Sequence, residues 1–297
     1  MTQLLQALVN GLALAAVYAL IALGFVIIYK SMQVLSFAQP GLLLIGAYWV
    51  TYFATTWGMP FWLALVVAVI LSALLGVVIE RGFLRPMVGK PIFAVAIMTI
   101  GIDLVIRIIT LDLVGVDVLP TGAPWGLKVV EFGGLNIAHR QIAAVITAVA
   151  LVALLLAFFK YSRFGLAMRA TAFDQEVALS QGVNVSAVFA TSWAIGAVLA
   201  MAAGIFLGPG GAFDRSMAVS ALKALPVIVV GGLDSIAGAL AGALIIAMAE
   251  MLAATYQPQY AEFLGKNFSQ VVPYLVMFVV LLVKPYGLFG TKEVERV

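Results

Sequence analysis

The chain has 297 residues, of which 64% are hydrophobic and only 10% are charged, and its formal net charge is +3. This composition leaves too little polar surface to cover a water-soluble globule, so it excludes a cytosolic enzyme, a disordered chain and a nucleic-acid-binding protein. A polytopic membrane protein remains. The chain has no cysteine and one histidine, which excludes disulfides, thiolate metal sites and sites built on two histidines.

Apolar segments long enough to form membrane-spanning helices follow one another along the chain. They cover residues 4–29, 34–57, 60–80, 92–111, 141–160, 187–208, 218–233, 235–256 and 270–284. These runs are too long and too continuously apolar to be the alternating strands of a membrane β-barrel. At about 20 residues per span, the sequence predicts an all-α polytopic membrane protein with about eight to nine transmembrane helices. No hydrophilic domain interrupts the runs, so we expect a single domain over residues 1–297.

The second run, 34–57, is interrupted close to its start. The interrupting residues are Ser36, Phe37, Gln39, Pro40 and Gly41. Proline removes a backbone donor and glycine weakens a helix, so the sequence predicts a broken or re-entrant segment there.

The run 218–233 is short for a span and carries Lys223 and Pro226, which predicts a second broken segment. It leads into a turn-forming stretch that contains Gly231, Gly232 and Asp234. Broken helices in corresponding halves of a transporter expose backbone polar groups to a site near the membrane midplane. Breaks in the first and last thirds of the chain therefore predict a solute path, with plain turns as the alternative.

Ionisable residues also occur within the apolar runs. Asp103 and Arg107 are four residues apart in the fourth run, a spacing that places both on one helix face. Because unpaired charges in a span are costly, we interpret them as an internal pair, with a solute path or a subunit interface as alternatives. Lys223 lies on the short run, and Glu250 is expected near the outer boundary.

Small residues recur at four-residue spacing in two later runs. They are Gly196, Ala200, Gly204 and Gly208 in one run, and Gly238 and Gly242 in the other. Such stripes allow helix backbones to approach closely. Static packing is one interpretation, and helices that line a translocation path and slide against each other are the other.

The basic residues predict the orientation of the chain. One side is expected to hold Lys30, Arg81, Arg85, Lys90, Lys160, Arg163, Arg169, Lys284, Lys292 and Arg296. The other is expected to hold Lys128, Arg140, Arg215 and Lys266. Basic residues accumulate on the cytoplasmic side, so the richer set is predicted to be cytoplasmic. The N-terminus then lies outside if 34–57 crosses the membrane, and inside if that run is only re-entrant.

The longest cytoplasmic loop, about 161–186, contains a predicted amphipathic helix over about 165–181. The helix is expected to end at Gly182, because glycine commonly terminates helices. A short helix with a polar face in the cytoplasm suits a docking contact, and an interfacial helix without a partner is the alternative.

No motif for nucleotide binding or catalysis is present. The phosphate-binding pattern G-x-x-x-x-G-K-[ST] is absent, and no paired carboxylates, Ser/His/Asp set or metal-ligand cluster is visible. We therefore expect no catalytic residue, no metal and no cofactor in this chain. The alternative, a self-contained secondary transporter or channel, would need its own site for a coupling ion or proton, and Asp103, Arg107 and Glu250 are the candidates for that site.

Five motifs in register resemble the LivH-type permeases of branched-chain amino-acid ABC importers. The first is V-L-S-F-A-Q-P-G at 34–41, continuing to G-A-Y at 46–48. The second is Glu80-Arg81 with L-R-P at 84–86 and T-I-G at 99–101. The third covers R-F-G at 163–165 to G-V-N at 182–184 and Ala203-Gly204. The last two are G-G-L-D-S-I-A-G-A-L-A-G at 231–242 and K-P-Y-G-L-F-G at 284–290.

The resemblance implies a permease of the bacterial cytoplasmic (inner) membrane that is embedded in the lipid bilayer and binds no nucleic acid. Its implied partners are a LivM-like second permease, two cytoplasmic ABC ATPases that bind ATP and Mg²⁺, and an extracytoplasmic substrate-binding protein. The 161–186 loop would dock an ATPase. The residues expected to couple to it are Arg163, Gly165, Arg169, Asp174 and Gly182.

The substrate path is expected to involve both breaks, where the chain departs from the family pattern. Ser36 and Gln39 replace the usual Asn and His, Pro40 follows, and Asp234 replaces a small residue. Branched-chain or other hydrophobic amino acids are the expected substrates. Urea or a short amide, carried by the same architecture, is the alternative.

Overall fold

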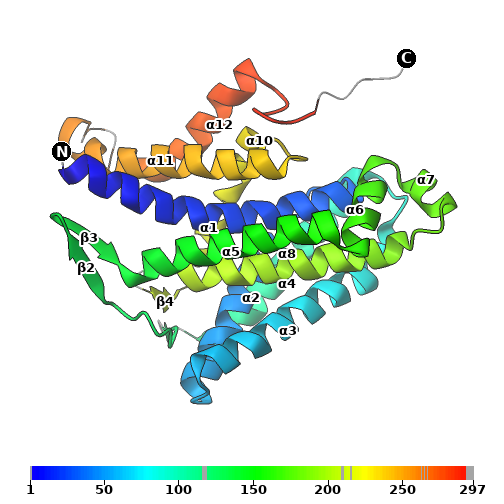
Figure 1. The fold of residues 1–297 in the computed structure, drawn as a ribbon, viewed down its shortest axis with the longest axis horizontal. Coiled ribbons are helices and arrows are strands. Elements are labelled where there is room, and N and C mark those ends of the chain that lie inside the picture. Colours follow the sequence, from blue (N-terminus) through cyan, green and yellow to red (C-terminus); the bar gives the residue numbers. More distant parts are fainter. Residues whose placement is uncertain are drawn as a thin grey trace.

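The computed structural model describes residues 2–115, 119–208, 211–214, 216–261, 263, 265 and 267–291. Of the basic residues used to predict the orientation, Arg215, Lys266, Lys292 and Arg296 lie outside these ranges. Within them the chain is almost entirely helical, which confirms the predicted all-α membrane class (Figure 1).

Six helical segments of the described chain are long and apolar enough to cross a membrane. They are α1 (Thr2–Met32), α3 (Phe61–Ile79, continued by helical turns to Met87), α4 (Ile92–Val114), α5 (His139–Tyr161), α8 (Val185–Leu207) and α11 (Ile236–Tyr260). The runs 34–57, 218–233 and 270–284 form shorter helices instead. The predicted count of about eight to nine transmembrane helices, with one or two of them broken or re-entrant, is therefore loose, because these runs form short helices.

The shorter helices lie between and after the long ones. They are α2 (Gln39–Thr51, followed by a π-helical turn at Tyr52–Thr56), α6 (Arg163–Phe173), α7 (Gln175–Ser180), α9 (Met217–Ala221), α10 (Ala224–Gly231) and α12 (Val272–Val283). The expected break in 34–57 lies slightly earlier than predicted. The chain leaves α1 through Gln33, at φ 56°, and Gln39, Pro40 and Gly41 already belong to α2.

Within the described ranges, four short strands that were not predicted from the sequence lie in two antiparallel pairs. Strand β1 (Leu119–Pro120) pairs with β4 (Ala212–Phe213), and β2 (Val129–Phe132) pairs with β3 (Leu135–Ala138). The β2–β3 hairpin extends beyond the helices at the end of the molecule that also holds the N-terminus (Figure 1). Helices α6 and α7 lie at the opposite end, so α1 runs from one end to the other.

Helices α1 and α8 form the centre of the fold. Most residues of both are buried, whereas most residues of α3, α4 and α5 are half-buried or exposed. Helix α1 packs against α11, α8 and α5, and α8 also packs against α2 and α3. Close packing requires small residues: a Cβ on Gly76 of α3 would collide with the backbone of Trp193 on α8. The outer helices keep apolar surfaces that suit contact with lipid.

Candidate functional site

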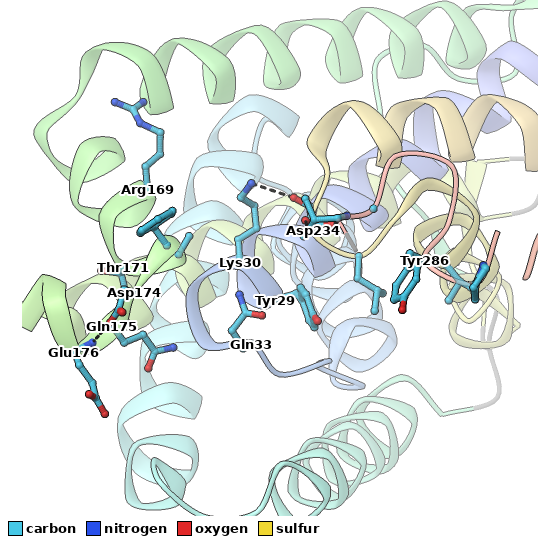
Figure 2. A pocket seen from close by; sticks show the side chains of 17 residues that line it. Tyr29, Lys30, Gln33, Arg169, Thr171, Asp174, Gln175, Glu176, Asp234 and Tyr286 are labelled. Carbon is cyan, nitrogen blue, oxygen red and sulfur yellow. Dashed lines mark hydrogen bonds between the residues drawn. The ribbon is translucent and has the colours of Figure 1, made fainter. Parts of the chain in front are cut away.

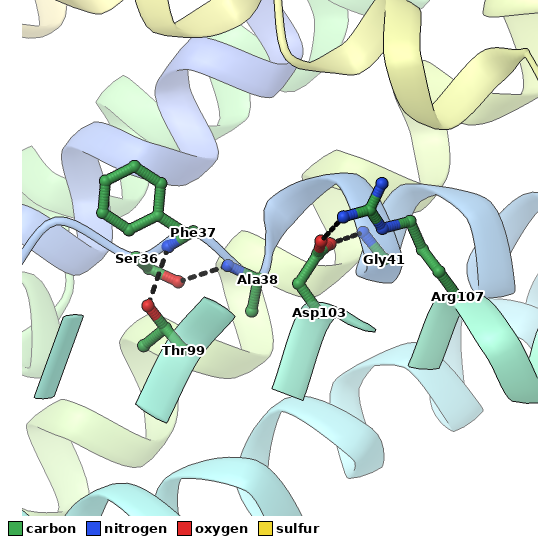
Figure 3. Close-up of polar contacts among 7 residues, drawn as sticks. All are labelled: Ser36, Phe37, Ala38, Gly41, Thr99, Asp103 and Arg107. Atoms are coloured by element: carbon green, nitrogen blue, oxygen red, sulfur yellow. Dashed lines mark hydrogen bonds and ion pairs between the residues drawn. The ribbon is translucent and has the colours of Figure 1, made fainter. Parts of the chain in front are cut away.

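The first break is held in place by α4. The backbone N–H of Phe37 donates to Thr99 Oγ1 at 3.0 Å, and that of Gly41 donates to Asp103 Oδ1 at 2.6 Å (Figure 3). The first N–H groups of a helix have no partner within it, and inside a membrane water does not replace one. Side chains of α4 therefore supply the acceptors that the start of α2 requires.

The predicted charge pair is part of this arrangement. Arg107 Nη2 forms an ion pair with Asp103 Oδ2, as Figure 3 shows. Asp103 is buried and Arg107 is partly exposed. The prediction that these residues meet on one face of a helix is confirmed. Their link to Gly41 could not be read from the sequence, because it joins residues 62 positions apart.

The side chain of Gln39 occupies the crossing of α1 and α8. It is fully buried, and ideal Cβ atoms built on Gly24 and Gly196 would lie 3.1 and 3.2 Å from its amide. Neither polar atom of the amide has a hydrogen-bond partner among the described residues. A buried amide without partners is costly, so Gln39 is the most unusual side chain at the first break.

The other residues of this break have local roles. Ser36 is buried and accepts a hydrogen bond from the N–H of Ala38 at 3.4 Å. Pro40 lies in the first turn of α2, where its missing N–H costs nothing, and Phe37 is half-buried. Their predicted function in lining a substrate path stays a prediction.

The second break joins α10 to α11. Helix α10 ends at Gly231, Gly232 has φ 111°, and Ser235 caps α11 by accepting from the N–H of Gly238 at 3.0 Å. The backbones of Gly231 and Gly238 are in contact, and a Cβ on Gly242 would collide with Val227 O. Gly238 and Gly242 therefore provide close packing between α10 and α11.

The stripe on α8 also faces the interior of the chain. Gly196 packs near Gln39, Ala200 is fully buried, and a Cβ on Gly204 would lie 2.7 Å from Leu43 O. The carbonyl of Gly208 accepts a hydrogen bond from Arg140. These contacts show that the stripe packs closely within the chain, and its predicted part in a translocation path stays a prediction.

The predicted cytoplasmic helix consists of two helices rather than one. Asp174 separates α6 from α7, with an extended backbone at φ −158°, and caps α7 by accepting from the N–H groups of Glu176 and Val177 at 2.9 and 3.0 Å. Gly182, at φ 79°, follows α7 as predicted. Aspartate prefers the N-cap to a helix interior, which explains the break.

Helix α6 is fixed against the end of α5. Ser162 caps it by accepting from the N–H of Gly165 at 2.8 Å, and Gly165 packs directly on the backbone of Phe158 and Phe159. Arg169 donates to the carbonyl of Phe159. Replacing Gly165 is therefore expected to displace α6, whereas the side chain of Arg163 is exposed.

A cavity of about 990 Å³ lies between α6–α7 and the rest of the chain (Figure 2). Charges of both signs line it, and they include Lys30, Arg169, Asp174, Glu176 and Asp234. Lys30 Nζ donates to the carbonyl of Asp234 at 3.0 Å, and the Asp234 carboxylate accepts from the Thr291 hydroxyl. The structure thus places Asp234 beside the α6–α7 region and not with Gln39.

A polar cluster that was not predicted from the sequence joins α1, α11 and the start of α10. Lys223 Nζ and Glu250 Oε1 are 2.5 Å apart, and the hydroxyl of Tyr18 donates to Glu250 Oε2 at 2.7 Å. Glu250 thus meets Tyr18 near the middle of the long helix α1, whereas the sequence placed it near the outer boundary. The sequence showed that Lys223 and Glu250 are both charged residues within apolar runs. It did not show that they pair, because they are 27 residues apart and lie at the start of α10 and within α11.

Comparison with known proteins gives consistent matches over almost the whole chain. The profile of a family described as "Branched-chain amino acid transport system / permease component" matches residues 7–281. The high-affinity branched-chain amino acid transport system permease protein LivH of Escherichia coli K12 is 32% identical, over 99% of this chain and 97% of its own. The corresponding BraD protein of Pseudomonas aeruginosa is 30% identical, over 99% and 98%.

More distant proteins also align. A probable branched-chain amino acid transport permease LivH of Methanocaldococcus jannaschii is 27% identical, over 93% of this chain and 90% of its own. The solved structure of PsaBC from Streptococcus pneumoniae in complex with Fab covers 94% of this chain and 91% of that chain, with 14% identity and a TM-score of 0.49.

Proposed function

Because the chain belongs to the family of branched-chain amino acid transport permeases, we propose that it is the transmembrane permease subunit of an ATP-binding-cassette importer. Its proposed cargo is a branched-chain or other hydrophobic amino acid. The observation that carries the proposal is similarity to such permeases over nearly the full length of both chains, in a molecule with six helices suited to crossing a membrane.

ATP-driven transport requires a surface that receives movement from an ATPase, and we assign it to α6 and α7. Both helices are short, capped at their N-termini by Ser162 and Asp174, and fixed to the bundle. They present exposed apolar side chains at one end of the molecule: Phe164, Leu166, Phe173, Val177 and Leu179. Such side chains suit burial in a protein partner. Arg163 adds an exposed positive charge.

The chain itself is proposed to carry out no chemistry. No group of three or more potential metal-ligating side chains occurs among the described residues. ATP and Mg²⁺ would be bound by two cytoplasmic ATPases. A second, LivM-like permease would complete the path, and a substrate-binding protein outside the membrane would deliver the amino acid.

The path for a zwitterion requires polar groups inside the membrane. The buried amide of Gln39, which has no partner among the described residues, is the proposed side-chain contribution from the first break, together with the buried Ser36. Ser36 and Gln39 stand where the family pattern that the chain resembles has Asn and His, so this pair of residues is also a proposed determinant of which solute passes.

Purification of the tagged chain from its native membrane in mild detergent, followed by mass spectrometry, tests the proposal. We expect a homologous permease and ATPases to be recovered with it, and ATP-dependent uptake of a branched-chain amino acid by the reconstituted complex. Recovery of the chain alone, with uptake independent of ATP, would identify a secondary carrier or channel. Competition on the cognate binding protein would distinguish an amino acid from urea or a short amide.

A further inference from the structure

Three polar side chains from distant parts of the sequence meet inside the apolar bundle. Lys223, Glu250 and Tyr18 come from the start of α10, from α11 and from α1, and we refer to them as the interior cluster. The exposed fraction is 9% for Lys223, 5% for Glu250 and 1% for Tyr18. Both carboxylate oxygens of Glu250 have a donor, since Lys223 lies at 2.5 Å and the Tyr18 hydroxyl at 2.7 Å. The negative charge is therefore fully compensated.

Because burying a charge is costly, the interior cluster favours one particular packing of its three helices. A carboxylate or an ammonium inside an apolar bundle is stable only while its partner is present. Hydrophobic residues of similar volume would pack these helices without that requirement. The cluster therefore favours one particular arrangement of α10 and α11 against α1, in which both charges keep their partners.

A second polar contact holds the same helices together at the end that carries α6 and α7. Lys30 of α1 donates to the carbonyl of Asp234 in the turn between α10 and α11, at 3.0 Å, and we call this the end contact. Tyr18 and Lys30 are twelve residues apart on α1, about 18 Å along a helix. Lys223 and Asp234 lie at the two ends of α10. Helix α10 is thus attached to the α1–α11 pair at both of its ends.

The end contact belongs to the lining of the cavity beside α6 and α7. Lys30 and Asp234 share that cavity with Arg169 and Asp174 (Figure 2). Between the cavity and the interior cluster, α10 is buried over most of its length and packs on α11 and α1. Gly231 against Gly238, and Gly242 against Val227, pack the backbones of α10 and α11 closely together.

We propose that Lys223, Glu250 and Tyr18 are positioning residues that make α1, α10 and α11 move as one body, so that displacement at the α6–α7 end reaches the membrane interior. This rests on the proposed function. The groups act on the helices and not on the amino acid. Loss of the interior cluster would remove the polar link between the start of α10, α11 and α1, and ATP hydrolysis would continue while the interior no longer follows.

The test uses the complete transporter with its ATPases and partner permease, reconstituted in vesicles, and measures substrate transported per ATP hydrolysed. In Lys223→Met and Glu250→Gln we expect this ratio to fall at least tenfold, while ATP hydrolysis stays within twofold of wild type. Tyr18→Phe, which removes one of two donors, should lower the ratio about threefold. The control Asp112→Asn neutralises an exposed carboxylate on α4 and should leave it unchanged.

A variant with one unpaired buried charge can fail to assemble, so the double variant Lys223→Met, Glu250→Gln decides the question. It removes both charges at once and should assemble at wild-type yield. We expect it to hydrolyse ATP but to transport at least fivefold less substrate per ATP than wild type, because the ionic link between Lys223 and Glu250 is missing. A wild-type ratio in the double variant, or in either single variant that assembles, would overturn the proposal.

The failure of the proposed function gives a different result. If the reconstituted wild-type complex shows no ATP-dependent uptake of any hydrophobic amino acid, the proposed function is wrong before any variant is compared. If wild type transports and the double variant retains full coupling, only the positioning role is wrong, and the cluster serves folding alone.

Discussion

Asp103 on α4 accepts a hydrogen bond from the backbone N–H of Gly41, at 2.6 Å, and so caps a helix that starts inside the bundle. The same carboxylate holds Arg107 with its second oxygen. One ionisable side chain thereby satisfies the start of a broken helix and neutralises a second charge. Inside an apolar bundle, an unpaired backbone N–H at the start of α2 and an unpaired Arg107 would each be costly.

Replacing Asp103 by Ala is expected to destabilise the permease by about 2–4 kcal/mol, since it removes a charge-assisted hydrogen bond and leaves Arg107 unpaired. The partial exposure of Arg107 keeps the loss toward the lower end. Thermal unfolding in detergent measures the change. Asp103→Asn keeps an acceptor for Gly41 and should lose less. Equal stability of the Ala variant and wild type would show that the cap contributes nothing.

Gly76 and Gly101 make a matched pair for testing close packing. A Cβ on Gly76 would collide with the backbone of Trp193, whereas nothing lies within 4 Å of a Cβ on Gly101. Gly76→Ala should lower stability by about 1–3 kcal/mol through overpacking of α3 against α8. Gly101→Ala should be neutral or should stabilise α4 by up to about 1 kcal/mol. Similar melting temperatures for the two variants would contradict this contrast.

Asp174→Ala should weaken ATPase docking without unfolding the membrane helices. The substitution removes the cap of α7, worth about 1 kcal/mol, so that the exposed helix frays. We expect less ATPase to be recovered with the purified chain and slower transport, with an unchanged melting temperature. Asp174→Asn preserves the cap and should retain most activity. Glu176→Gln, which changes charge without removing the cap, is the control. Normal recovery of ATPase with Asp174→Ala would exclude a docking function that depends on this cap.

Gln39→Met should separate the stability of the permease from its transport activity. The amide has no hydrogen-bond partner among the described residues, so an apolar side chain of similar length should raise stability by about 1–2 kcal/mol. If the amide serves the substrate path, transport should fall at least tenfold in the same variant. Measuring both in one preparation gives the test, and undiminished transport by Gln39→Met or by the Ser36→Ala, Gln39→Ala variant would remove Gln39 from the path.

Patterns within single segments predicted much of the architecture. Hydropathy located the six long helices, and Gly and Pro located both breaks to within one helical turn. The four-residue spacing of Asp103 and Arg107 predicted their ion pair. The amphipathic stretch at 165–181 was helical as predicted, but its division at Asp174 was missed because the helical periodicity continues across that residue.

Pairings between distant segments required the tertiary structure. The sequence alone determined that the chain is a helical membrane protein. The hydrophobicity of a run and the need to pair its backbone hydrogen-bonding groups within lipid are both local properties of that run. The sequence could not show that Asp103 caps α2 or that Glu250 binds Lys223 and Tyr18. Nor could it show that Asp234 lies beside α6 and α7 and not beside Gln39. These relationships depend on which helix faces pack together, and small residues such as Gly24 and Gly196 decide that by permitting backbone contact at chosen crossings.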